Sequence, residues 1–98
     1  MAAAVTHARS IALTGSDQAV RAAASVFRGY VVIETGGASA ATVRIYDNAS
    51  AASGTLIGAV NLAAGGSADV SGKDLWCENG IYVDVGGSGT VAGSVQVG

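Results

Sequence analysis

Few side chains in this sequence could take part in catalysis. His7 is the only histidine and Cys77 the only cysteine. A histidine that acts as a general base needs a nucleophile and an orienting acid close by, and the residues around His7 supply neither. Cys77 has no basic neighbour except Lys73 to stabilise a thiolate, so we expect a buried structural thiol. These residues predict no catalytic site, and we expect that the protein is not an enzyme.

Two further patterns have some of the features of ligand sites. Residues 87–93 have the glycine content of a dinucleotide-binding loop, but a valine-rich strand follows, not the helix whose N-terminus would hold phosphate. Asp69, Asp74, Glu78 and Asp84 carry oxygen ligands suited to Ca²⁺, but their spacing matches no calcium loop. We interpret them as solvated loop acids, and we predict neither a cofactor nor a bound metal.

The remaining candidates are aromatic side chains that could contact a partner. Tyr30, Tyr46 and Tyr82 each take the outward position of an alternating segment, and Trp76 lies close to a turn. Half-buried strand aromatics explain this pattern, but so does a shared contact face, because tyrosine is enriched at interfaces and tryptophan often anchors them. Tyr30, Tyr46, Trp76 and Tyr82 are therefore the candidate interface residues.

The segment 26–34 is the predicted central strand, because it combines the only phenylalanine with a β-branched run. Strict alternation gives a core-facing set of Phe27, Gly29, Val31 and Ile33. It gives an opposite set of Arg28, Tyr30, Val32 and Glu34. Gly29 interrupts the strand, and a glycine at such a place often marks a bulge or the close approach of another backbone.

Similar alternation recurs along the chain between turns rich in Gly, Ser and Asn. The clearest further strands are residues 42–47, 55–62, 81–85 and 90–97. The side chains predicted to point inward are Val43, Ile45, Ile81, Val83 and Val85. In residues 55–62, Leu56 has the same parity as Val60 and Leu62. Residues 17–24 are compatible with a short helix capped by Ser16, but we favour a strand over 19–25 that leads into the central strand, since no large apolar stripe is present. Short strands at this spacing predict an all-β, antiparallel β-sandwich of about seven strands, Ig-like or jelly-roll-like.

The composition limits the domain organisation and the class of partner. A chain of 98 residues forms one domain, in which the weakly patterned residues 1–17 are an N-terminal arm or a first strand and residues 18–98 are the sandwich domain. Only 12% of residues are charged and the net charge is −2, which disfavours nucleic-acid and membrane partners. No secretory leader or long apolar run is recognisable, so we expect synthesis in the cytoplasm. Proline is absent and Lys73 is the only lysine, so the residues that normally protect sheet edges are scarce and we expect an assembly.

Three strand patterns carry a resemblance to a known group of proteins. They are Arg28-Gly29-Tyr30 with Val32 and Glu34-Thr35, then Ala41-Thr42-Val43-Arg44-Ile45-Tyr46-Asp47 followed by Gly54-Thr55-Leu56, and finally Asn79-Gly80-Ile81-Tyr82-Val83. With these patterns, residues 18–97 resemble small virion proteins of tailed bacteriophages, of the capsid decoration (cement) or head-fibre type.

The resemblance implies a structural protein that binds the outer surface of a phage capsid and stabilises it. The implied partners are the major capsid protein and further copies of the chain, as a homotrimer in many members. The implied location is the virion surface, after synthesis in the host cytoplasm, and the group offers no catalytic residues. The alternative is a carbohydrate- or receptor-binding β-sandwich module of a phage tail or fibre, for which Trp76 and the outward tyrosines are the aromatic candidates.

Overall fold

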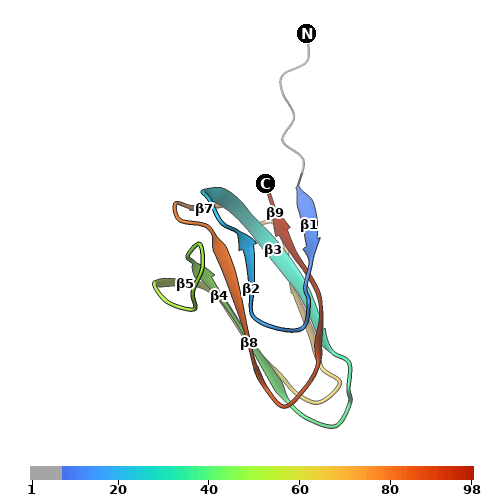
Figure 1. Cartoon of the computed structure of the whole chain (residues 1–98). Coiled ribbons are helices and arrows are strands. Elements are labelled where there is room, and N and C mark those ends of the chain that lie inside the picture. Colours follow the sequence, from blue (N-terminus) through green and yellow to red (C-terminus); the bar gives the residue numbers. More distant parts are fainter. Residues whose placement is uncertain (1–7) are drawn as a thin grey trace.

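The structure is a computed structural model that describes residues 8–98, and within them it contains nine strands and no helix (Figure 1). The strands are β1 (Arg9–Ala12), β2 (Gln18–Arg21), β3 (Ser25–Glu34), β4 (Ala41–Asp47), β5 (Thr55–Leu62), β6 (Ser67–Val70), β7 (Leu75–Cys77), β8 (Ile81–Gly87) and β9 (Val91–Val97). All strand pairs are antiparallel, in two sheets. The predicted all-β antiparallel sandwich is therefore confirmed. His7 and the rest of residues 1–7 lie outside the described part of the chain.

The strand pairs are nested within one another along the sequence. The first sheet has the order β1-β9-β3-β6, with β7 also paired to β3, and the second has the order β2-β8-β4-β5. The first strand therefore pairs with the last, β2 with β8, β3 with both β6 and β7, and β4 with β5. If β6 and β7 are counted as one interrupted strand, eight strands form a long hairpin rolled into two sheets. This is the jelly-roll arrangement, one of the two sandwich types that the sequence predicts.

The N-terminal part of the described chain belongs to the sandwich. β1 pairs with β9, with Arg9 opposite Val97, so residues 9–12 form a first strand at the edge of the first sheet. The helix considered over 17–24 is absent, and the favoured strand over 19–25 is wrong in extent. Gln18–Arg21 forms β2 in the second sheet, and residues 22–24 then cross to β3 in the first. Val20 is the one large apolar side chain available here, and it is buried.

A bulge in β3 reverses the predicted faces of its second half. Phe27 lies opposite Val97 and Gly29 opposite Gln96, so one additional residue is present in β3 at Arg28. Gly29 has a φ of 149°, and a Cβ on it would collide with the carbonyl oxygen of Val70, so only glycine fits there. The extra residue shifts the alternation by one position.

The faces predicted after Gly29 are therefore wrong, although the bulge itself was expected. Phe27 is buried as predicted, but beyond the bulge the buried residues are Tyr30, Val32 and Glu34. Val31 and Ile33, predicted in the core, are 49% and 41% exposed. The central strand thus directs the predicted set of side chains into the core before Gly29 and the opposite set after it.

The core between the sheets follows the predicted alternation in most other strands. Val43, Ile45, Ile81 and Val83 are buried, as predicted, and Val85 packs partly buried against them. The exception is β5, where Gly58 lies opposite Ile45 and Leu56 opposite Tyr46. Ile57 is therefore the additional residue of a second bulge and packs on the core, while Leu56 is 49% exposed. Leu56 therefore does not share a face with Val60 and Leu62, and the parity predicted for it is wrong.

Candidate interaction surface

The structure places the four candidate interface residues in three different environments. Tyr30 lies in the core at 6% exposure, since the bulge at Gly29 turns it inward. Its predicted outward position is wrong, and in this fold it has no surface to offer a partner. Tyr46 and Tyr82 are half-buried in the second sheet, and Trp76 is exposed in the first. The four aromatic residues do not form one face.

Tyr46 and Tyr82 form the centre of a row that crosses the whole second sheet. Tyr82 lies opposite Tyr46, Ala19 lies opposite Tyr82, and Leu56 lies opposite Tyr46. Directly opposed residues in an antiparallel sheet share a face and have neighbouring Cβ atoms. The row alternates with the buried residues Ile45 and Val83, so it lies on the outer face. We call Ala19, Tyr82, Tyr46 and Leu56 the outer row.

The outer row offers mainly apolar surface with two hydroxyl groups. Leu56 and Ala19 are exposed at its two ends, and the two tyrosine rings lie between them. Paired aromatic rings gain stabilisation beyond their buried area, and their phenol groups remain available for hydrogen bonds. The sequence identified both tyrosines, but it missed Leu56 and Ala19. The face on which Leu56 lies could not be predicted because of the bulge at Ile57. A single alanine such as Ala19 does not distinguish a contact residue from any other surface residue.

Beside the outer row lies a polar group of side chains. Asp84 in β8 lies opposite Arg44 in β4. The pKa of Asp84 is raised by burial and by the hydrogen bond and negative charge of Asp17, and Arg44 opposes this shift. The guanidinium of Arg44 donates to the carbonyls of Val43 (3.0 Å) and Val60 (3.1 Å) and to Asn61 Oδ1 (2.8 Å). These groups bound the apolar row on one side.

Trp76 is the most exposed large apolar side chain of the described chain. It is 60% exposed in β7, next to Leu75 at 42%, and lies opposite Val26 in the first sheet. Its neighbour Cys77 is fully buried, so alternation directs the indole outward. Trp76 therefore forms a contact point separate from the outer row.

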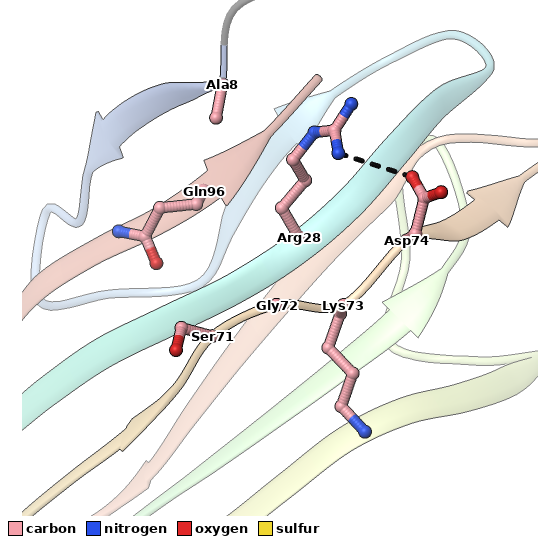
Figure 2. Close-up of a pocket in the computed structure, with 7 residues that line it drawn as sticks. All are labelled: Ala8, Arg28, Ser71, Gly72, Lys73, Asp74 and Gln96. Carbon is pink, nitrogen blue, oxygen red and sulfur yellow. Dashed lines mark hydrogen bonds and ion pairs between the residues drawn. The ribbon is translucent and has the colours of Figure 1, made fainter.

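A groove of about 370 Å³ lies near β7 and was not predicted from the sequence (Figure 2). Ala8, Arg28, Gln96 and the segment 71–74 line it. Arg28 Nη1 contacts Asp74 Oδ1 at 3.3 Å, whereas Lys73 points away from this pair (Figure 2). Arg28 Nε is buried and has no acceptor among the described residues. The groove thus offers the hydrogen-bond donors of Arg28, whose positive charge is partly neutralised by Asp74. No spacing of residues in the sequence could have revealed this groove.

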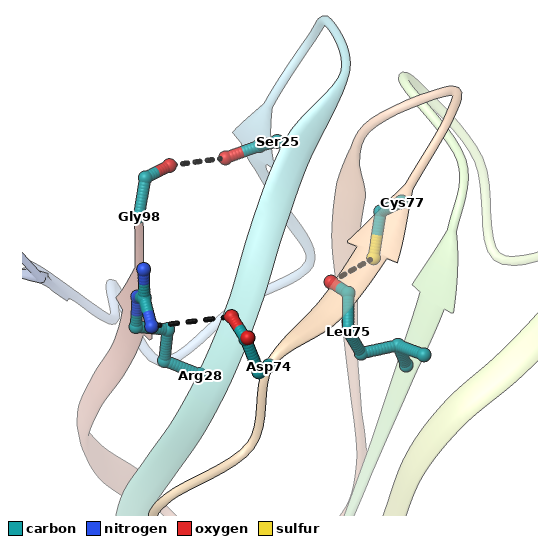
Figure 3. Close-up of polar contacts among 6 residues, drawn as sticks. All are labelled: Ser25, Arg28, Asp74, Leu75, Cys77 and Gly98. Atoms are coloured by element: carbon teal, nitrogen blue, oxygen red, sulfur yellow. Dashed lines mark hydrogen bonds and ion pairs between the residues drawn. The ribbon is translucent and has the colours of Figure 1, made fainter. Parts of the chain in front are cut away.

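The same region ties the last strand to β3 (Figure 3). Ser25 Oγ donates to the carbonyl of Gly98 at 3.1 Å, and the amide of Gly98 donates to the carbonyl of Val26 at 2.9 Å. Cys77 Sγ lies 3.8 Å from the carbonyl of Leu75, to which it donates (Figure 3). Burial, and secondly the charge of Asp47, raise the pKa of the Cys77 thiol. The expected buried structural thiol is confirmed as buried, and its thiolate form is disfavoured.

Among residues 8–98, Glu34 is the one buried acidic side chain, and it joins three loops at one end of the sandwich. Its Oε2 accepts from the amides of Gly36 (2.8 Å) and Thr90 (2.9 Å), and its Oε1 accepts from those of Gly37 (2.7 Å) and Gly65 (2.8 Å). These bonds lower the pKa of Glu34 to about 2, with the bond from Gly65 contributing most. The loops β3–β4, β5–β6 and β8–β9 meet at the lower end of Figure 1. At neutral pH the carboxylate is ionised and fully engaged, so it acts as a structural clamp.

The described residues contain no cluster of three or more His, Cys, Asp or Glu side chains that could hold a metal ion. Within residues 8–98, no helix long and apolar enough to cross a membrane is found. Comparison of the chain with known proteins gives no matching family model, no similar curated protein and no similar solved structure.

Proposed function

We propose that the protein is a structural component of a virion that binds the outer surface of a phage capsid and stabilises it. The observation that carries this proposal is the outer row, an apolar and aromatic strip that crosses all four strands of the second sheet. The resemblance of the sequence to decoration proteins, which also supports the proposal, lies in the strand patterns around Arg28, Val43 and Ile81. Jelly-roll sandwiches include viral capsid domains, which supports the proposal by analogy of fold alone.

The proposed attachment is mainly apolar. The outer row carries no charge, and only 12% of the residues of the chain are charged. Contacts of this kind depend on buried apolar area and hydrogen bonds, which salt screens little. The bound protein then stabilises the shell by mass action, because it binds the assembled state.

The test is binding of the purified protein to undecorated capsids at low and high salt. We expect binding under both conditions, and we expect Tyr82→Ser to weaken it about tenfold or more, as loss of an interface aromatic does. The matched control is Val31→Ser, which removes an exposed apolar side chain from the other sheet. Absence of binding by the folded wild-type protein under both conditions would reject the proposal, and binding lost only at high salt would reject the apolar mechanism.

A carbohydrate- or receptor-binding module of a tail or fibre is the second candidate. The specific observation in its favour is the 60% exposure of Trp76, since sugar rings and peptide anchors commonly pack on an exposed indole. A glycan array distinguishes the two candidates. Binding that Trp76→Ala abolishes, while Tyr82→Ser leaves it intact, would favour this candidate over capsid decoration.

A further inference from the structure

The two sheets of the sandwich leave four sheet edges, and these edges are protected very unequally. The first sheet ends at β1 on one side and at β6 and β7 on the other, while the second ends at β2 and β5. An unpaired edge presents free backbone N–H and C=O groups, which can pair with another chain. Natural proteins prevent this with short edge strands, charged residues or proline.

Three of the four edges have such protection. β1 and β2 are four residues long and contain Arg9 and Arg21. β6 has four residues including Asp69, and β7 has three and follows directly on Lys73 and Asp74. Short length and charge therefore coincide at each of these edges.

The edge formed by β5 has neither kind of protection. Thr55–Leu62 is eight residues long, with the sequence TLIGAVNL, and contains no charged residue and no proline. Among residues 8–98 it pairs only with β4. Two charged residues of β4 lie opposite β5, Asp47 opposite Thr55 and Arg44 opposite Ala59. Arg44 Nη1 donates to the carbonyls of both Val43 and Val60, so the guanidinium lies over the seam between the two strands. The bulge at Ile57 interrupts one end of the strand only.

We propose that β5 pairs antiparallel with the β5 strand of a second copy of the chain, which joins the second sheets of two molecules into one. An uncharged strand gives no like-charge repulsion between two copies. The part of the chain that the structure describes has one unprotected edge per molecule, so a two-fold pairing covers both edges at once and closes at two subunits. A ring or fibre would need a second open edge, and the opposite edge, β2, is short and charged. This inference does not rest on attachment to a capsid.

The first test is the mass of the free protein in solution, by light scattering or sedimentation. We expect twice the chain mass of 9.5 kDa for the wild type. Ala59→Lys places a charge at an exposed position of β5, and we expect it to raise the dimer dissociation constant at least tenfold. The matched control is Ala12→Lys, at an exposed position of the protected edge β1, which we expect to remain dimeric. Circular dichroism establishes that both variants are folded.

The second test locates the contact by cross-linking. A single cysteine at Ala59, near the middle of β5, in a Cys77→Ser background should give dimers with a short bis-maleimide, because a two-fold antiparallel pair brings equivalent positions together only near its axis. Ala12→Cys in the same background should not. A monomer or trimer mass for the wild type, a dimer unaffected by Ala59→Lys, or cross-links absent from β5 would each overturn the proposal. None of these results decides whether the protein binds capsids, which the capsid-binding assay measures separately.

Discussion

Val31 and Val32 are neighbours in β3, yet Val31 is 49% exposed and Val32 is completely buried. Their opposite environments follow from the bulge at Gly29, which shifts the alternation of the strand by one residue. The same shift places Tyr30 in the core and Glu34 beneath three loops. One glycine therefore decides the roles of five following residues.

The two valines provide a direct test of this shift. We expect Val32→Ala to lower the free energy of unfolding by about 2 kcal/mol, because it removes buried methyl groups and leaves a cavity. Val31→Ala removes exposed methyl groups and should change it by no more than about 0.5 kcal/mol. Urea unfolding of both variants measures the difference. Equal losses, or a larger loss for Val31→Ala, would contradict the bulge.

Gly29 itself should be far less replaceable than another glycine with positive φ. Gly72 has a φ of 74° and open space around its Cα, so Gly72→Ala should cost about 1 kcal/mol for backbone strain alone. In Gly29→Ala the new methyl group would also collide with the carbonyl of Val70, and we expect about 3 kcal/mol or more. Chemical denaturation measures the free energy of unfolding of both variants, and the difference between their losses is the contribution of the close approach between Gly29 and the carbonyl of Val70. Similar costs at the two positions would show that β6 moves aside freely.

Glu34 should make the protein sensitive to acid. Its pKa is about 2 in the folded state, below the ordinary value of 4.5, so the folded state favours the carboxylate. The stabilisation is complete above pH 4.5 and is lost as the pH falls toward 2. We expect Glu34→Gln to lower the stability at pH 7 and to flatten the fall in stability over this pH range, measured by thermal melts. Glu78→Gln, at an exposed acid, is the control and should keep the wild-type pH profile.

Asp84 should have the opposite effect on stability. Its pKa is raised, chiefly by burial and by Asp17, so the folded state disfavours its charged form. We expect Asp84→Asn to raise the stability at pH 7 by about 0.5 kcal/mol or less, since the group is near the surface. This gain should vanish as the pH falls below the ordinary aspartate pKa of 3.8. A loss of stability at pH 7 would mean that the attraction between Asp84 and Arg44 outweighs the effects of burial and of Asp17.

Cys77 should react with thiol reagents only when the fold opens. The side chain is completely buried, and burial raises the pKa of its thiol, so both access and the thiolate fraction are reduced. We expect labelling in native buffer to be about a hundredfold or more slower than in denaturant. Ala12→Cys in a Cys77→Ser background, at an exposed position, should be labelled rapidly. Comparable rates for the two thiols would contradict the burial of Cys77.

The alternation of apolar residues was enough to predict the sheets and much of the core. Val43, Ile45, Ile81 and Val83 lie in uninterrupted strands, so the period of two identified their faces correctly. It failed at Val31 and Leu56, each of which follows or adjoins a bulge whose extra residue is defined by pairing with another strand, β9 for Val31 and β4 for Leu56. The sequence at Gly29 indicated that an irregularity was present, but not that the count of residues would change there.

The candidate surface was only partly predictable for a related reason. Tyr46 and Tyr82 were identified as outward residues, but they lie opposite each other only because β4 and β8 are neighbours in the sheet, and the two tyrosines are 36 positions apart in sequence. The clamp at Glu34 could not be predicted, because its donors come from three loops that only the folded topology brings together. Local patterns specify the strands, while the sites arise from contacts between distant parts of the chain.

The nested strand order also determines how the protein responds to mechanical force. Arg9 and Val97 are opposite one another in the outermost pair, β1 and β9. A pull between these two residues acts across the pair, so its hydrogen bonds are loaded one after another and separate at low force, as in a zipper. A pull along a strand would instead load all the bonds of its ladder together. Force applied between Arg9 and Val97 should therefore open the sandwich more easily than force applied along its strands.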